Sequence, residues 1–293
     1  MSVFKGACVA MITPFDDNGI NYDCLSSLIE YYIDGGVKAL CVCGTTGEPA
    51  TMSADERRSV IDFAVKKIAG RVPVIAGVGC NSTASTIANA IEAEKLGVDA
   101  LLVVTPYYNK CTQKGLIAHY TAVASSVSIP VITYNVPSRT GVNLLPCTMA
   151  ELAKVDNIVG IKEASGNVDQ LQELIRLCGD KVDIYLGEDA LTFVGCALGA
   201  SGVISVAANV APKLMQDICD LTYDGKINEA KTLQLKLLPL IKNLFCEVNP
   251  IPVKKAMNLL GFSAGSPRLP LTVMEDDNAE KLALSMRELS IID

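Results

Sequence analysis

Short apolar runs rich in β-branched residues alternate with amphipathic helical patterns along most of the chain. Between residues 22 and 34, for example, apolar positions repeat at i, i+3, i+4 and i+7, which predicts a helix that Gly35 ends. Eight runs are typical of buried strands, and they cover residues 7–15, 39–43, 72–76, 100–104, 130–134, 157–165, 184–186 and 202–206. Strands that alternate with helices predict the α/β class, and eight evenly spaced units predict a (β/α)8 TIM barrel. A doubly wound sheet, the structural alternative, would not need eight units.

The chain from about residue 225 onward carries only helical patterns. They cover residues 226–245, 253–260 and 278–289, and no linker or low-complexity run separates them from the barrel. We therefore expect residues 1–224 to form the (β/α)8 barrel with the active site, and residues 225–293 to form a C-terminal α-helical domain.

The composition excludes several classes of protein. Of the 293 residues, 50% are hydrophobic and 19% are charged, and the net charge of −7 argues against nucleic-acid or anionic-membrane partners. We expect no signal peptide and no membrane span, since the apolar runs fall well short of ~20 residues. Eleven cysteines lie mostly in apolar patterns without a Cys-x-x-Cys pair, and the single histidine, His119, is interpreted as structural. These features favour a reduced, cytoplasmic protein with no metal and no cofactor.

A lysine stands where the apolar character of the sixth run, residues 157–165, comes to its end. In α/β barrels, ligands and chemistry gather at the carboxyl ends of the strands. A lysine that emerges from an apolar wall has its ammonium form disfavoured, so Lys162 is a candidate nucleophile near neutral pH. The alternative is that Lys162 extends its charge to solvent, as most lysines do.

Polar residues also follow the neighbouring runs, and a barrel would bring them to the same face. The set is rich in hydroxyls and poor in metal ligands, which suits Schiff-base chemistry on a small keto acid. It comprises Thr13, Thr45, Thr46, Tyr107, Tyr108, Tyr134, Arg139, Glu163, Glu188 and Asp189. The Gly-Thr-Thr-Gly turn at 44–47 can present backbone N–H groups to a small anion, or it can be only a tight turn.

Four motifs resemble the dihydrodipicolinate synthase family of pyruvate-dependent class I aldolases. They are Gly-Thr-Thr-Gly-Glu at 44–48, Thr-Pro-Tyr-Tyr-Asn at 105–109, Tyr-Asn-Val-Pro-Ser-Arg-Thr-Gly at 134–141 and Gly-Ile-Lys-Glu-Ala at 160–164. The similarity runs nearly end to end and includes Asn-Pro-Ile-Pro-Val-Lys at 249–254. It implies a lyase that condenses pyruvate with aspartate β-semialdehyde to 4-hydroxy-tetrahydrodipicolinate, the first committed step of diaminopimelate and lysine biosynthesis.

The resemblance also implies which residues are catalytic. Lys162 would form a Schiff base with pyruvate. Tyr134 would act as acid and base beside it, linked through Thr45 to Tyr108 in a proton relay. In this family the second tyrosine comes from the neighbouring subunit, so the resemblance implies a tight homodimer, commonly paired into a homotetramer.

Substrate-binding roles follow from the same motifs. The resemblance implies that Thr46, together with Thr45, holds the pyruvate carboxylate and that Gly187 and Ile204 line the pyruvate pocket. Arg139 would meet the carboxylate of aspartate β-semialdehyde. Sialic acid lyases and keto-deoxy-sugar-acid aldolases share the lysine and the tyrosine, and Arg139 favours the synthase over them.

The sequence also bears on feedback by lysine and on two other classes of function. Lysine-inhibited members carry a histidine and a glutamate where this chain has Ala54 and Ser85, so we expect weak or absent feedback by lysine. A phosphate- or nucleotide-binding barrel would use the loops after the seventh and eighth strands. A non-catalytic binding or assembly module is the third hypothesis, since fold does not fix function.

Overall fold

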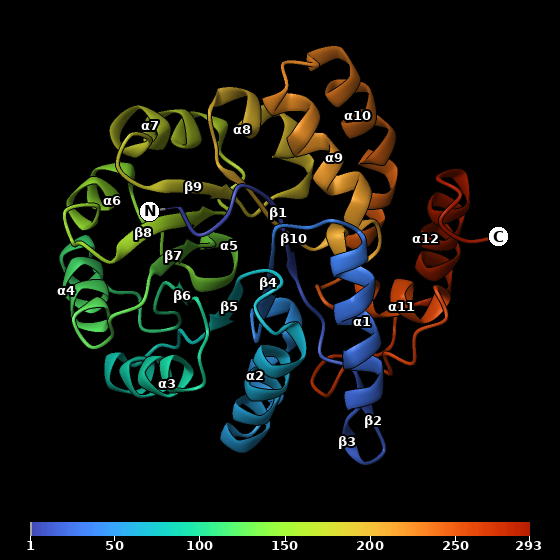
Figure 1. The fold of residues 1–293 in the computed structure, drawn as a ribbon, viewed down its shortest axis with the longest axis horizontal. Helices are drawn as coiled ribbons and strands as arrows, with labels where there is room; N and C mark the ends of the chain where they lie inside the picture. Colours follow the sequence, from blue (N-terminus) through green and yellow to red (C-terminus); the bar gives the residue numbers. More distant parts are fainter. Residues whose placement is uncertain (1) are drawn as a thin grey trace.

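A closed barrel of parallel strands forms the centre of the computed structural model, which describes residues 2–293 (Figure 1). Around the barrel the strand order is β1-β10-β9-β8-β7-β6-β5-β4. The bounds are β1 (Gly6–Ala10), β4 (Ala39–Val42), β5 (Val74–Gly77), β6 (Ala100–Val104), β7 (Val131–Asn135), β8 (Ile158–Glu163), β9 (Asp183–Leu186) and β10 (Gly202–Ser205). Each predicted run supplies one of these strands, so the predicted (β/α)8 barrel is confirmed.

Helices surround the barrel and cover its outer face, apart from the short α5 (Pro137–Thr140), which lies inside their ring (Figure 1). Their bounds are α1 (Tyr22–Asp34), α2 (Ala54–Ile68), α3 (Thr83–Lys95), α4 (Gln113–Ala124), α5 (Pro137–Thr140), α6 (Pro146–Leu152), α7 (Val168–Cys178), α8 (Thr192–Leu198) and α9 (Pro212–Tyr223). Short 3₁₀ turns follow several strands: η1 (Thr45–Gly47), η2 (Pro49–Thr51), η3 (Asp189–Leu191) and η4 (Ala207–Asn209). These turns lie at the carboxyl ends of their strands, where a TIM barrel carries its site.

The first strand ends earlier than the sequence pattern predicts. β1 stops at Ala10, and Phe15 pairs instead with Ile20 in a two-stranded antiparallel sheet of β2 (Phe15–Asp16) and β3 (Gly19–Ile20). Pro14 has no N–H for a barrel ladder. The Phe15 N–H donates to the Ala264 carbonyl at 3.1 Å. The chain therefore leaves the barrel after β1 and runs against the C-terminal segment.

Two apolar layers hold the barrel together. The larger layer lies between the strands and the surrounding helices. The smaller one fills the barrel interior with the inward-facing side chains of the strands, including Cys8, Cys41, Ile75, Leu102, Ile132, Tyr185 and Ile204. The interior is thus a packed apolar core.

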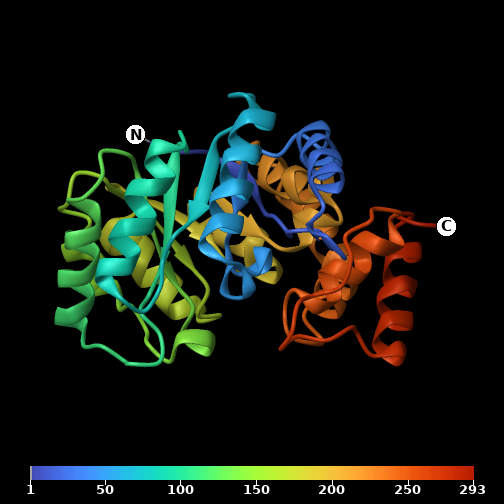
Figure 2. The same cartoon turned by 90° about the horizontal axis from the view of Figure 1, so that it is seen from below.

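Three further helices follow the barrel, α10 (Ile227–Leu244), α11 (Ile251–Leu259) and α12 (Asp276–Glu288). Figure 2 shows them gathered at one side of the barrel. α10 packs along α8 and α9, and α12 packs along α10. The division at residues 224 and 225 falls between α9 and α10 and stays a prediction. None of the helices in residues 2–293 combines the length and apolarity that crossing a membrane requires.

Candidate active site

Lys162 and Tyr134 lie side by side at the mouth of the barrel. They are register partners on the adjacent strands β8 and β7. The Lys162 ammonium nitrogen lies 4.5 Å from the centre of the Tyr134 ring, and each residue is only 6% exposed. Lys162 therefore stays inside the mouth instead of extending to solvent. The strand alternation and the hydrogen-bonded register together fix an amine against a phenol ring.

Gly187 leaves the room that the Lys162 side chain occupies. A Cβ at residue 187 would lie 3.0 Å from Lys162 Cε and 2.5 Å from the Ala164 Cβ. A side chain at residue 187 would therefore clash with the Ala164 Cβ and crowd the end of the Lys162 chain. Ile204 is fully buried on β10 and belongs to the interior cluster with Tyr134. Gly187 thus lies against the lysine chain, and the predicted role of Gly187 and Ile204 in a pyruvate pocket stays a prediction.

The turn that follows β4 is a 3₁₀ turn, with Thr46 buried inside it. It is closed by the Gly47 N–H, which donates to the Gly44 carbonyl at 2.9 Å, and by the Glu48 N–H, which donates to Thr45 at 3.2 Å. The N–H groups of Thr45 and Thr46, at the start of the turn, take no part in closing it. The turn is therefore both tight and able to receive an anion.

Asn249 is a site residue that sequence reasoning missed. Its side-chain N–H donates to Thr46 Oγ1 at 3.0 Å, and its backbone carbonyl accepts from Arg139 Nη2 at 3.4 Å. It precedes α11, far from both partners along the chain. Its only signal in the sequence is its place in the Asn-Pro-Ile-Pro-Val-Lys motif. The C-terminal segment thus touches both groups that are expected to hold carboxylates.

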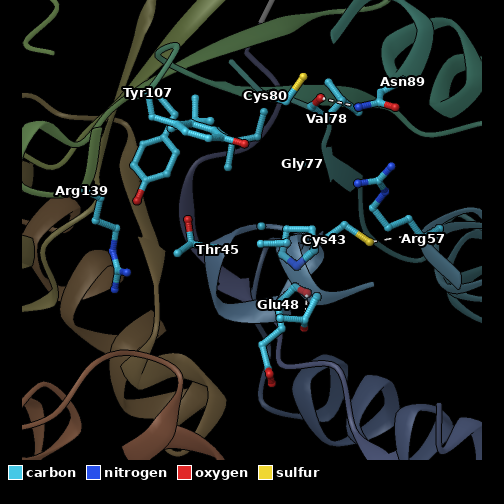
Figure 3. Close-up of a pocket in the computed structure, with 18 of the residues that line it drawn as sticks. Cys43, Thr45, Glu48, Arg57, Gly77, Val78, Cys80, Asn89, Tyr107 and Arg139 are labelled. Carbon is cyan, nitrogen blue, oxygen red and sulfur yellow. Dashed lines mark hydrogen bonds between the residues drawn. The ribbon is translucent and has the colours of Figure 1, made fainter. Parts of the chain in front are cut away.

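A cavity of about 430 Å³ opens at the mouth of the barrel. It is lined by Thr45, Tyr107, Tyr134, Arg139 and Asn249 among others. Figure 3 shows Thr45, Tyr107 and Arg139 around it. Lys162, Thr46, Gly187 and Ile204 are not part of its lining, and Lys162 lies against the ring of Tyr134.

Tyr108 is a predicted site residue that the fold of one chain leaves exposed and away from the cavity. It is 86% exposed, it does not line the cavity, and its φ is +73° in the loop after β6. A positive φ is uncommon for a residue with a large side chain and marks a backbone that its surroundings hold in place. The predicted relay from Tyr134 through Thr45 to Tyr108 is therefore not assembled within a single chain.

Two carboxyl groups near the lysine have raised pKa values. The pKa of Glu188 is raised, mainly by burial and then by the neighbouring Asp189 carboxylate, and Lys162 and Arg139 oppose the shift. Burial also raises the pKa of Asp189, whose Oδ2 accepts the N–H groups of Val206 and Ala207 at 3.1 and 2.8 Å.

Thiols form part of the barrel floor beneath the lysine. Burial raises the pKa of Cys41 to about 11 and also raises that of Cys8 well above its ordinary value. Both thiols stay neutral near pH 7 and contribute to the low-polarity surroundings of the amine. Within residues 2–293, no group of three or more histidine, cysteine, aspartate or glutamate side chains is placed to hold a metal ion. The arrangement offers a buried amine and an adjacent phenol, with Thr45 and Arg139 on the cavity wall.

The fold and the site together define a (β/α)8 barrel enzyme of the Schiff-base type. The family model "Dihydrodipicolinate synthetase family" matches residues 3–289. The 4-hydroxy-tetrahydrodipicolinate synthase of Caldicellulosiruptor saccharolyticus is 52% identical over 292 residues, which cover 99% of each chain. The chain belongs to the dihydrodipicolinate synthetase family.

Solved structures show the same likeness. The dihydrodipicolinate synthase of Acinetobacter baumannii, solved in complex with pyruvate, superposes with a TM-score of 0.96 at 43% identity, over 98% of this chain and 99% of that one. A variant described as the first monomeric dihydrodipicolinate synthase gives a TM-score of 0.98 at 41% identity, over 99% and 98% of the two chains.

Proposed function

We propose that the chain condenses pyruvate with aspartate β-semialdehyde to 4-hydroxy-tetrahydrodipicolinate, the reaction of the synthases it resembles. The observation that carries the proposal is the buried Lys162 held against the Tyr134 ring at the mouth of the barrel. A buried amine is a nucleophile in its neutral form, and a phenol beside it can move the protons that imine formation requires.

The chemistry begins when the Lys162 amine adds to the C2 carbonyl of pyruvate. Loss of water gives an iminium ion, and loss of a methyl proton converts it to an enamine. The enamine carbon attacks the aldehyde of the second substrate, and the Tyr134 hydroxyl protonates the resulting alkoxide. The amino group of the adduct then adds to the imine carbon, closes the ring and displaces Lys162, which restores the free amine.

This series of reactions requires that the carboxylates of both substrates be oriented. The unused N–H groups at the start of η1 suit the pyruvate carboxylate, because adjacent backbone N–H groups form an anion nest. Arg139 lies across the cavity and suits the carboxylate of aspartate β-semialdehyde, since a guanidinium binds it with two parallel hydrogen bonds. Sugar-aldehyde acceptors lack a carboxylate for Arg139, which favours the semialdehyde.

The exposed Tyr108 supports a proposal about assembly. We infer that its hydroxyl completes the proton relay of a neighbouring copy, so that the active unit is a homodimer, with a homotetramer as its paired form. A hydrophobic phenol ring that is 86% exposed on a constrained backbone suits burial in a partner. We propose a cytoplasmic enzyme, in agreement with the unpaired cysteines.

Trapping with sodium borohydride tests the proposal. Borohydride with pyruvate should leave a stable reduced adduct that maps to Lys162, and the Lys162→Ala variant should give neither adduct nor condensation. Full activity of Lys162→Ala would contradict the mechanism. A coupled assay that compares aspartate β-semialdehyde with sugar aldehydes then distinguishes the synthase from the lyase and aldolase alternatives.

A further inference from the structure

Two cysteine thiols meet between helices α8 and α9, away from the active site. Cys196 Sγ lies 4.0 Å from Cys219 Sγ. Cys196 keeps 5% of its surface exposed and Cys219 keeps none. The two helices pack directly on each other. A disulfide needs its sulfur atoms about 2 Å apart, so the two sulfurs would have to come about 2 Å closer to form one.

The surroundings of this thiol pair favour ionisation of Cys196, the less completely buried of the two cysteines. The Tyr223 hydroxyl lies 3.4 Å from Cys196 Sγ, and the Lys5 ammonium lies 4.3 Å from the centre of the Tyr223 ring. The pKa of Cys196 is lowered, first because Cys219 can donate a hydrogen bond to its thiolate, and the pKa of Cys219 is raised in return. A thiolate with a second thiol beside it has the features of a cysteine that oxidises reversibly.

We propose that Cys196 and Cys219 form a reversible disulfide when the protein is exposed to hydrogen peroxide. The Cys196 sulfur attacks a peroxide oxygen and gives a sulfenic acid and one water. The Cys219 sulfur then attacks the sulfenic sulfur, the S–O bond breaks, and a second water leaves. In sum, two thiols lose two electrons and two protons, and one hydrogen peroxide is reduced to two waters. A dithiol reductant reverses the bridge by thiol–disulfide exchange.

The position of the pair predicts what the bridge does. Tyr223 donates to the Ala200 carbonyl at 3.1 Å, just before β10 begins, so the thiols lie near the amino-terminal end of the barrel. Lys162 lies at the opposite, carboxyl-terminal mouth. The bridge would tie α8 to α9 at the base of the barrel and restrict the unfolded chain, which raises thermal stability without touching the reacting groups.

Peptide mapping of the intact protein tests the proposal. The full chain is treated with hydrogen peroxide, its remaining thiols are alkylated under denaturing conditions, and the digest is analysed by mass spectrometry. We expect a cross-linked peptide that joins residues 196 and 219 and disappears with dithiothreitol. Cys147→Ser, which removes an exposed thiol, is the matched control and should still form the bridge.

Two further readouts make the outcome decisive. In Cys219→Ser the second thiol is missing, so Cys196 should instead become labelled by dimedone, which traps sulfenic acids. The midpoint of thermal unfolding should rise in the bridged wild type and return on reduction. The proposal is overturned if Cys196 and Cys219 stay reduced while Cys147 is fully oxidised, or if Cys196 bonds to another cysteine. An unchanged midpoint in the bridged protein would overturn the proposed tie between the helices.

Discussion

Replacement of Lys254 by methionine should strongly destabilise the protein. Lys254 Nζ lies 2.7 Å from Glu48 Oε1, and the two side chains are 1% and 2% exposed. The same nitrogen donates to the Ser266 carbonyl at 3.2 Å and lies 4.0 Å from the centre of the Phe15 ring. Burial lowers the pKa of Lys254, and the Glu48 carboxylate opposes that shift. The pair is therefore a buried ion pair with additional partners.

The expected magnitude follows from the charge that is left behind. Methionine fills most of the space of the lysine chain, so packing changes little, whereas the Glu48 carboxylate stays buried without its counter-ion. Breaking a buried ion pair by removing one partner costs about 3–5 kcal/mol. The loss in Glu48→Gln/Lys254→Met should be smaller than the sum of the two single losses, because no unpaired charge remains.

Urea unfolding at fixed protein concentration measures these differences. The chain has no tryptophan, so far-ultraviolet circular dichroism is the suitable signal. Lys255→Met is the matched control, since Lys255 is the next residue of α11 and is only partly buried. A loss for Lys254→Met below about 1 kcal/mol, or equal to that of Lys255→Met, would show that the pair contributes little.

Three further predictions concern the site, the pH dependence and regulation. Asn249→Ala removes the hydrogen bond to Thr46, so steady-state assays should show KM for pyruvate rising about tenfold, the equivalent of ~1.4 kcal/mol, with a smaller change in kcat; an unchanged KM would argue against positioning by Asn249. Arg268 lowers the pKa of Glu56 from 4.5 to about 2, so this pair stabilises the fold fully above pH 4.5 and less as pH falls towards 2. Acid unfolding followed by circular dichroism should accordingly begin at higher pH in Arg268→Ala. Micromolar lysine should leave the condensation rate unchanged because Ser85 offers no charge to it, and inhibition in that range would refute the expectation.

The sequence was sufficient to predict the central pair of the site. Lys162 and Tyr134 each end an apolar run, and in a TIM barrel such positions reach one face. Pattern alone could not show that the two are register partners, because register depends on hydrogen bonding between strands. The barrel was predictable for the same reason, since eight buried strands leave eight similar apolar runs.

Contacts between distant segments were beyond the reach of pattern. Asn249 meets Thr46 across 203 positions, and Lys254 meets Glu48 inside the same packing of the C-terminal segment on the β4 turn. A buried lysine looks like any other lysine in a sequence, because its burial depends on what folds over it. The early end of β1 has the same origin, since Phe15 leaves the barrel to bond with Ala264.

The Gly-Thr-Thr-Gly turn shows how the two original interpretations of that motif are related. A tight turn and an anion nest were alternatives at the level of residue types, because glycines permit either. In the fold, the N–H groups of Gly47 and Glu48 form the hydrogen bonds that close the turn. The N–H groups of Thr45 and Thr46 take no part in those bonds. Asn249 then fixes the Thr46 hydroxyl from outside. The tight geometry is thus what holds the free N–H groups in place, so a change that loosens the turn should weaken anion binding before it affects the lysine.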